Sequence, residues 1–261
     1  MVSSINKLET RVMKKLAALI IEDRFFEDFG ETCNNHLKYL PQDTDLYVYT
    51  SEENKEKYRE QLGKFNIEPN YIDYVKDMEI PLPIRYINGI EQFQSNDRMK
   101  ALLNMCMFMT RPEFWKEYFD YDRVLIFQRD SGVLREGIEE FFEYDYVGAP
   151  CYNFVRDQTI QNGGFSLRNP RVMEYICRLY GWKTDLQDLM VVGQYSSASF
   201  FAEDIFFCLR MIKHNAGKLA PLEISKKFSC ESRFESGTLG YHNIEVYMTE
   251  DEVKTLKEQA K

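Results

Sequence analysis

The sequence predicts an α/β fold in which a mostly parallel central sheet is flanked by helices. A continuous apolar run at residues 16–21 ends abruptly at charged residues, which is typical of a strand buried on both faces. Helical and strand patterns alternate after it, as they do where crossover helices join parallel strands. At 261 residues, the chain is long enough to bury a full core as one domain.

The chain opens with a strand, a helix, a second strand and a second helix. Apolar residues at 25–40 recur with helical spacing, and Pro41 ends that helix. Residues 45–49 have the pattern of a second strand. Thr50 with Glu53 predicts a capping box for a helix that runs to about residue 65.

The later elements follow from the same patterns, with segment 182–201 expected to be a surface loop. The remaining predictions, in chain order, are a short strand at 71–75, helices at 99–109 and 112–119, a strand at 124–127, a short helix at 137–142, a strand at 144–148 with a turn at Ala149-Pro150, a strand at 164–167, helices at 170–180 and 203–214, a mixed segment at 219–228, and a terminal helix that Thr249 and Glu252 cap.

Composition narrows the classes of function. The formal net charge of −9 argues against non-specific binding to nucleic acid, which needs a basic surface. No apolar run approaches the roughly 20 residues of a transmembrane helix, and the start has no signal-peptide pattern. The six cysteines show no zinc spacing, and four fall on apolar helical stripes, so buried free thiols in a reducing compartment are expected. These observations predict a cytoplasmic protein.

Asp130 is the sharpest candidate for chemistry. It follows the apolar strand at 124–127, and open α/β sheets present ligand-binding groups at the carboxyl ends of strands. An Asp in this place also forms turns or caps helices, and Ser131 and Gly132 fit that alternative. As a functional group, it would be a ligand of Mg²⁺ or Mn²⁺, which prefer carboxylate oxygens.

Three further features each have a structural and a functional interpretation. Glu203 and Asp204 could simply complement a helix dipole, or Asp204 could be a general base. The pair Gly163-Gly164 could form a bulge, or it could let the backbone approach a ligand closely. His242, in a glycine-containing turn, could be a surface histidine or a ligand.

Together, these stretches resemble the glycosyltransferase family known as a domain of unknown function, DUF5672, and beyond it the GT-A class of nucleotide-sugar glycosyltransferases. The most specific stretches are Tyr-Asp-Tyr-Val-Gly-Ala-Pro at 144–150 and Asn-Gly-Gly-Phe-Ser-Leu-Arg at 162–168. The other family-like stretches, in the family's order between about residues 16 and 242, are 20–24, 114–115, 125–131, 203–204 and 240–242.

The resemblance implies an enzyme that uses a nucleotide-diphosphate sugar and a divalent metal, Mn²⁺ or Mg²⁺, which neutralises the leaving diphosphate. An Asp-x-Asp sequence and often a late His hold this metal in GT-A enzymes. Asp130 matches the last Asp and His242 the late His, whereas Gln128 replaces the first Asp. Because a carboxamide is a neutral and weaker ligand, low metal affinity or a bridging water is expected.

The resemblance also assigns roles to other residues. Asp204, with its neighbour Glu203, matches the catalytic-base position of inverting members. The residues expected to bind the nucleotide sugar are Ile21, Glu22, Arg24, Thr50, Gln128, Arg129, Asp130 and Ser131. Those expected at the acceptor and sugar site are Asn162, Gly163, Gly164 and Phe165.

The expected function is therefore that of a hexosyltransferase-like enzyme. It would move a sugar from a UDP-sugar, or from a GDP- or TDP-sugar, to a hydroxyl of a glycan or glycoconjugate, with Asp204 as general base and inversion at the anomeric carbon. A retaining course remains open if Asp204 does not lie near that carbon. Gln128 favours an alternative, a non-catalytic module that binds a nucleotide or a glycan. A two-metal phosphoesterase would need more carboxylate and His ligands than the sequence offers.

A single domain is expected over residues 1–261. Its nucleotide-sugar half would span about 14–135 and its acceptor half about 136–248, and a C-terminal helix would follow at about 249–259.

Overall fold

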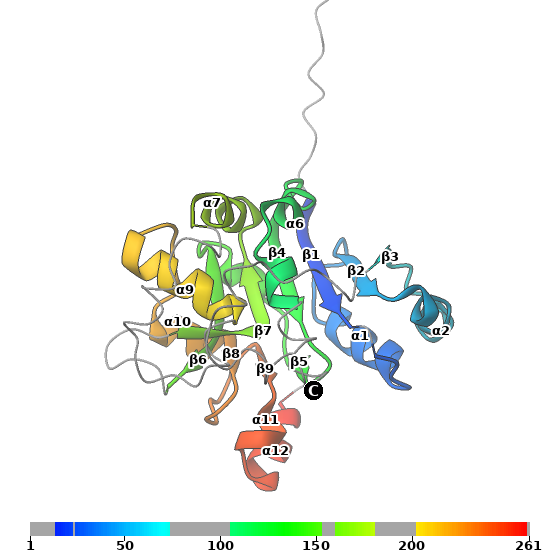
Figure 1. The fold of residues 1–261 in the computed structure, drawn as a ribbon. Coiled ribbons are helices and arrows are strands. Elements are labelled where there is room, and N and C mark those ends of the chain that lie inside the picture. The colour runs from blue at the N-terminus through cyan, green and yellow to red at the C-terminus, as the bar shows by residue number, and fades with distance from the viewer. Residues whose placement is uncertain (1–13, 23, 74–104, 153–159, 181–201, 260–261) are drawn as a thin grey trace, which may run out of the picture.

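The computed structural model describes residues 14–22, 24–73, 105–152, 160–180 and 202–259 (Figure 1). The strands are β1 (Lys14–Ile21), β2 (Asp45–Thr50), β3 (Asn70–Asp73), β4 (Tyr121–Phe127), β5 (Ser131–Val133), β6 (Tyr146–Cys151), β7 (Ile160–Arg168), β8 (Ser229–Cys230) and β9 (Gly240–His242). The helices are α1 (Phe29–Leu37), α2 (Glu52–Gly63), α6 (Pro112–Lys116), the short 3₁₀ helix η1 (Ile138–Phe141), α7 (Pro170–Tyr180), α9 (Glu203–His214), α10 (Leu222–Phe228), α11 (Ile244–Tyr247) and α12 (Glu250–Lys257).

Six strands form the central sheet, in the order β3-β2-β1-β4-β7-β6. The first four of these run parallel to one another, and β7 and β6 then add to β4 as antiparallel strands. The predicted α/β fold with a mostly parallel sheet is therefore confirmed. Because β1, β2 and β4 are parallel, their carboxyl ends share one edge, where open α/β sheets place ligand sites.

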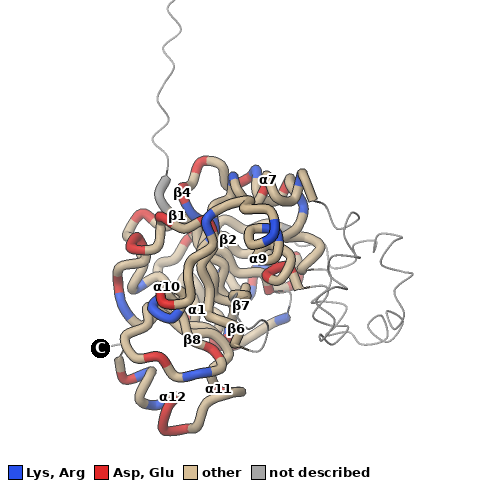
Figure 2. Tube along the Cα trace, turned by 90° about the vertical axis from the view of Figure 1, so that its left-hand side faces the viewer, with Lys and Arg blue, Asp and Glu red and all other residues tan. Residues whose placement is uncertain are grey.

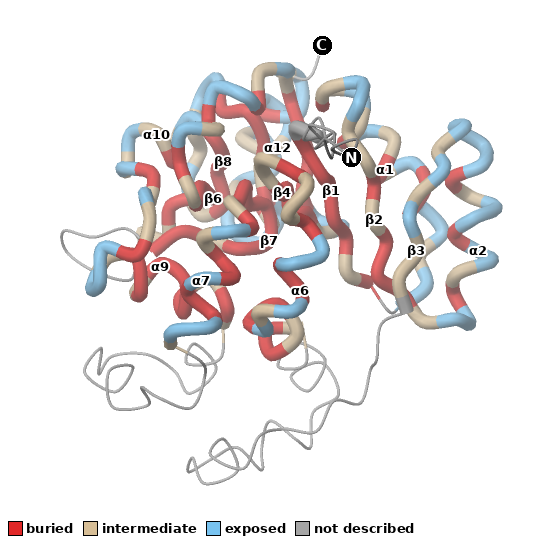
Figure 3. The backbone as a smooth tube through the Cα atoms, turned by 90° about the horizontal axis from the view of Figure 1, so that it is seen from above, coloured by how far each residue is buried: buried red, intermediate tan, exposed pale blue. Residues whose placement is uncertain are grey.

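Helices cover both faces of this sheet, as the view from above shows, with the buried strands between two helical layers (Figure 3). One layer consists of α1, α2, η1 and α10, which pack on alternate residues of β1 such as Leu16, Ala18 and Ile20. The other consists of α6, α7 and α9, which pack on Ala17 and Leu19. Successive side chains of a strand point to opposite faces, so the continuous apolar run of β1 serves both layers.

A second, small sheet lies beside the first, with the strand order β5-β9-β8. Strand β9 pairs antiparallel with β5, which places His242 opposite Ser131. It also pairs in parallel with β8, which places Tyr241 opposite Cys230. This sheet joins the segment after β4 to the C-terminal part of the chain.

Several predicted elements are confirmed. Helices α7 and α9 have the predicted bounds, and Thr249 and Glu252 form the predicted capping box of α12. All six cysteines are free thiols, and five of them are buried. The predicted loop at 182–201, and residues 99–104 of the predicted helix at 99–109, lie outside the described residues.

Other predictions were wrong. Thr50 is the last residue of β2 and does not cap α2, whose N-cap Ser51 makes no side-chain cap hydrogen bond. Ala149 and Pro150 lie inside β6, where the pairing with β7 shifts register, and do not form a turn. A register shift accommodates proline because it removes the need for its missing N–H.

Acidic and basic residues are interspersed along the outer segments of the described chain (Figure 2). This distribution agrees with the net charge of −9 and gives no basic stripe for a nucleic-acid backbone among the described residues. None of the described helices is long and apolar enough to cross a membrane.

Candidate active site

The small sheet brings His242 to the carboxyl end of β4. The turn between β4 and β5 carries Gln128 and Asp130, and the backbone N–H of Asn243 donates to the carbonyl of Asp130 at 2.8 Å. The Nε2 atom of His242 lies 3.1 Å from Oε1 of Gln128 and 3.3 Å from Oδ1 of Asp130. Three residues that the sequence analysis proposed for the metal or the donor thus meet although they lie up to 114 positions apart.

The imidazole of His242 is buried between two carboxylates. On its other side, Nδ1 lies 3.2 Å from Oε1 of Glu231. Burial disfavours a charged ring, but the hydrogen bonds to Asp130 and Glu231 outweigh it and raise the pKa of His242 to about 9. Burial opposes ionisation of Asp130 as well, and the His242 hydrogen bond more than offsets it, so the pKa of Asp130 is lowered.

Gln128 Oε1, Asp130 Oδ1 and His242 Nε2 are atoms of the kinds that bind divalent cations. Adjacent ligands of a cation bound at about 2.1 Å lie about 3 Å apart, close to the two separations measured from Nε2. Among the described residues, no group of three or more His, Cys, Asp and Glu side chains is arranged to hold a metal. This set has only two such residues because its third member is an amide.

Gly163 and Gly164 separate this cation set from the start of α9. A Cβ at Gly164 would overlap the imidazole of His242, and a Cβ at Gly163 would overlap the carboxylate of Glu203. Both positions therefore require glycine, because Glu203 and His242 contact the β7 backbone from its two sides and leave no room for a Cβ atom. The glycine pair thus lies between the two groups of predicted site residues.

Asp204 lies on the far side of this backbone and is half-buried. Its Oδ2 accepts from the N–H of Gly163 at 3.0 Å, and its Oδ1 accepts from the N–H of Ile205 at 2.6 Å. Burial and the adjacent Glu203 carboxylate raise the pKa of Asp204 to about 7, although the backbone donors and Arg168 oppose this shift. A carboxylate with such a pKa can accept a proton near neutral pH.

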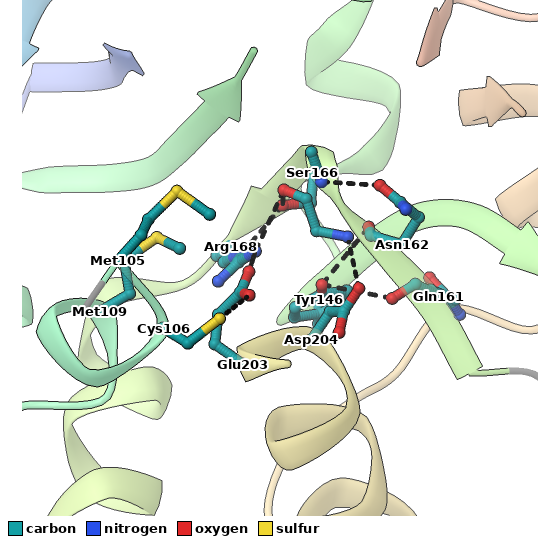
Figure 4. A network of polar contacts seen from close by, with 12 residues as sticks. Met105, Cys106, Met109, Tyr146, Gln161, Asn162, Ser166, Arg168, Glu203 and Asp204 are labelled. Carbon is teal, nitrogen blue, oxygen red and sulfur yellow. Dashed lines mark hydrogen bonds and ion pairs between the residues drawn. The ribbon is translucent and has the colours of Figure 1, made fainter. Parts of the chain in front are cut away.

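Glu203 points into the protein and not toward His242. Its Oε1 accepts from Nη2 of Arg168 at 2.7 Å, and the Sγ of Cys106 donates to its Oε2 at 3.6 Å. The Arg168 side chain is fully buried and also donates to Ser166 Oγ and to the Gly163 carbonyl. Figure 4 shows the two acidic neighbours diverging, with Glu203 toward Arg168 and Asp204 toward the backbone beside Asn162. The ion pair thus fixes the strand on which Gly163 lies.

The residues expected at the nucleotide lie along the shared edge of the sheet. Ile21 ends β1, and the N–H of Glu22 continues the ladder to the Tyr49 carbonyl at 2.9 Å. The buried Glu22 carboxylate accepts two hydrogen bonds from the guanidinium of Arg24, at 2.9 and 3.0 Å. At the end of β2, Thr50 is buried, and its hydroxyl has no hydrogen-bond partner among the described residues.

Three other predicted site residues have their side chains engaged elsewhere. Arg129 makes two hydrogen bonds to the carboxylate of Asp28 and lies over the Phe26 ring at 4.0 Å. The Ser131 hydroxyl donates to the Gln128 carbonyl at 2.6 Å and lies 3.0 Å from Nε2 of His36. Burial lowers the pKa of His36 to about 4, so this ring is neutral. Phe165 is part of the core, stacked on Phe228.

Sequence reasoning missed Glu231 and the structural role of Arg168. Glu231 lies in a segment without helical or strand periodicity, and only the pairing of β8 with β9 places it beside His242. Arg168 had a signal of its own, because a charged residue that ends a buried strand requires a buried partner of opposite charge.

Three solved structures align with this chain to different extents. Mouse xyloside xylosyltransferase 1, in its apo form, aligns over 90% of this chain and 99% of its own, with 10% sequence identity and a TM-score of 0.53. The glycosyltransferase GlyE of Streptococcus pneumoniae TIGR4, in its apo form, aligns over 91% and 55%, with 14% identity and a TM-score of 0.45. Core-mannan synthase A of Aspergillus fumigatus, in its Mn/GDP form, aligns over 79% and 71%, with 9% identity and a TM-score of 0.44. The last two scores lie below 0.5, so the xylosyltransferase carries the comparison.

The six-stranded sheet with helices on both faces is thus the fold of the GT-A class of glycosyltransferases. At this level of identity, the likeness concerns the fold alone. No curated protein matches the sequence. The chain belongs to the family described as Protein of unknown function (DUF5672), which matches residues 89–242. The predicted family and fold class are therefore both confirmed.

Proposed function

We propose that this protein is a metal-assisted glycosyltransferase that moves a sugar from a nucleotide-diphosphate sugar to an acceptor hydroxyl. One observation carries the proposal. His242 Nε2 lies 3.1 Å from Gln128 Oε1 and 3.3 Å from Asp130 Oδ1 on one side of Gly163-Gly164, where these atoms would ligate a cation, and Asp204, with a pKa raised to about 7, lies on the other side. Paired groups with oppositely shifted pKa values are typical of sites that separate a charge-binding role from an acid–base role.

The donor would lie along the edge formed by the ends of β1, β2 and β4. Ile21, Glu22, Arg24 and Thr50 would contact the nucleotide, and Gln128 Oε1, Asp130 and His242 Nε2 would hold Mn²⁺ or Mg²⁺ near its diphosphate. When bound, the cation would neutralise the leaving diphosphate. A UDP-sugar is the first donor to test, with GDP- and TDP-sugars as alternatives.

Asp204 would act on the acceptor. It would remove the proton of an acceptor hydroxyl as that oxygen bonds to the anomeric carbon, and the bond from that carbon to the diphosphate would break with its electron pair leaving on the diphosphate. This displacement would invert the anomeric centre. Asn162, Gly163 and Gly164 would line the acceptor side, and the acceptor would be a glycan or glycoconjugate. Glu203 would support Asp204 through its ion pair with Arg168.

In this proposal, residues 14–135 supply the donor half of the site and residues 136–248 the acceptor half. His242 is the exception, because it reaches back to Asp130 on the donor side. A reducing compartment such as the cytoplasm is proposed on the basis of the six free thiols.

The neutral Gln128 supports a second candidate function, a module that binds a nucleotide or a glycan without transfer. Its amide replaces a charged ligand, which lowers the field available to stabilise a leaving group. Metal-dependent nucleotide binding that is accompanied by neither sugar transfer nor donor hydrolysis would establish this second function.

The first experiment is a thermal-shift screen of UDP-, GDP- and TDP-sugars, each with and without Mn²⁺. A ligand that binds only the folded state raises the melting temperature by mass action. We expect one donor to raise it only with Mn²⁺, and the effect to vanish in Asp130→Ala but not in the control Asp43→Ala, an exposed acid before β2. The absence of a shift with every donor would count against the proposed donor site.

A further inference from the structure

Glu231 owes its position to the small sheet. It directly follows β8, which pairs in parallel with β9 so that Cys230 lies opposite Tyr241. Glu231 follows Cys230, and His242 follows Tyr241, so Glu231 and His242 lie side by side. Their side chains meet in the interior. Glu231 is only 9% exposed. A buried carboxylate needs specific hydrogen-bond donors to offset the loss of water.

Two donors converge on one oxygen of Glu231. Its Oε1 accepts from Nδ2 of Asn162 at 3.0 Å and faces Nδ1 of His242 at 3.2 Å. A carboxylate cannot donate, so the hydrogen bond requires the proton to be on Nδ1. Nε2 faces the carboxylate of Asp130, which is also an acceptor, so both ring nitrogens carry a proton in this arrangement. A cation bound at Nε2 would replace only the proton there and would leave the one on Nδ1.

Asn162 locks this arrangement to the sheet. Its Oδ1 accepts from the N–H of Gly164 at 2.6 Å while its Nδ2 donates to Glu231. Because one partner can only donate and the other can only accept, the orientation of this amide is fixed by its contacts. The ring of His242 itself rests on Gly164, which leaves it little freedom to turn away.

We infer that Glu231 is a positioning residue that holds the imidazole of His242 with Nε2 directed at the cation set, and that Asn162 orients Glu231. The inference rests on the proposed metal dependence. Ligating histidines commonly donate their second ring N–H to a carboxylate, which fixes the tautomer and strengthens the ligand, and loss of such a partner costs about 10–100-fold in metal affinity.

The test compares Glu231→Gln with Glu235→Gln in the full chain. Glu235 lies in the same segment, but its carboxylate accepts from the Tyr152 hydroxyl at 2.6 Å and not from His242. Titration with Mn²⁺, with the free ion measured by electron paramagnetic resonance, is expected to show about 10-fold weaker binding for Glu231→Gln. The Glu235→Gln variant should bind as wild type does.

A second readout separates positioning from general destabilisation. The chain has three histidines, so the ring ¹⁵N signals of His242 can be assigned by substitution. With Mg²⁺ bound, wild type should show one tautomer protonated on Nδ1, and Glu231→Asp, which shortens the carboxylate arm, should show a mixture. This second variant keeps the charge and serves if Glu231→Gln does not fold.

The outcomes are distinguishable. If wild type binds Mn²⁺ and Glu231→Gln binds it equally well, the inference is overturned while the metal site stands. If wild type binds no Mn²⁺, the proposed metal dependence fails, and the inference fails with it. Weaker binding confined to the Glu231 variants, with the tautomer change, supports both.

Discussion

Asp130 and Asp204 are two aspartates on opposite sides of one glycine pair, and their surroundings push them in opposite directions. Asp130 faces the imidazole of His242, which lowers the pKa of the Asp130 carboxyl. Asp204 lies beside Glu203 in a buried setting, which raises its pKa to about 7. The same side chain is thus held ionised in one place and close to its titration point in the other, which suits a cation ligand and a proton acceptor.

The largest expected effect comes from removing the proton acceptor. Asp204→Asn keeps the size of the side chain but cannot take a proton, so we expect kcat for sugar transfer to fall about 10²–10⁴-fold. Mn²⁺-dependent donor binding should persist because the cation set lies across the glycine pair. Initial rates with saturating donor measure the loss. The control Asp251→Asn, an exposed acid on α12, should retain the wild-type rate. Full transfer activity in Asp204→Asn would remove this residue from the mechanism.

The second expected effect falls on stability. In Glu203→Gln, Arg168 would remain fully buried without its ionised partner, so the free energy of unfolding should fall by about 3–5 kcal/mol. Denaturant unfolding measures this change. The matched control is Glu140→Gln, whose partner Arg135 is partly exposed, and it should cost less than about 1 kcal/mol. Equal losses in the two variants would show that the buried ion pair stabilises the fold no more than the exposed one.

A third change acts on the cation side. Gln128→Glu has the same length and adds a carboxylate to the set around His242, so we expect it to tighten Mn²⁺ binding about 10-fold, since ligand charge raises affinity for hard cations. Calorimetric titration provides the measurement, with Gln259→Glu near the C-terminus as the control for added charge. Unchanged affinity would mean that the side chain of Gln128 does not reach the cation.

The last expected effect is a pH dependence that only Asp204, of the two aspartates, should cause above pH 4. With a pKa of about 7, Asp204 gains its basic form as pH rises through 7, so kcat should rise over that range and level off above it.

The free energy of unfolding should fall as pH rises over the same range. The folded pKa lies above the ordinary aspartate value of 3.8, so the folded state binds more protons than the unfolded state between pH 3.8 and 7, and this contribution to stability is lost as pH rises. The difference in unfolding free energy between wild type and Asp204→Asn, measured across pH 4–8, isolates this contribution. A difference that does not vary with pH would contradict the raised pKa.

The elements with a periodic sequence pattern are the ones that could be predicted. The continuous apolar run of β1 and the stripes of α7 and α9 specify their elements locally, so the sheet and its helical layers follow from periodicity. The same periodicity also predicted that the acidic pair Glu203-Asp204 begins a helix and that Asp130 follows a strand.

The pairing of strands is not visible in the same way. Strand β9 is three residues long and β8 only two, so neither carries a periodic pattern, and the partnership of Glu231 with His242 arises only when they pair. Similarly, Thr50 has the composition of a helix cap, but the ladder with β3 extends β2 through it. Tertiary contacts, and not local propensity, determine the secondary structure and the partners of such residues.

The late position of His242 has a consequence for the order in which the fold and the proposed cation site form during synthesis. The strands of the large sheet are all present once Arg168 has been synthesised, whereas His242, the histidine of the proposed cation set, is made much later, on β9. Helices α7, α9 and α10, which supply core residues on the two faces of the sheet, are also made before His242, so a nascent chain on the ribosome can bury most of its core before it has this histidine. The scaffold would then fold first, and the proposed cation site would be complete only after β9 has been made.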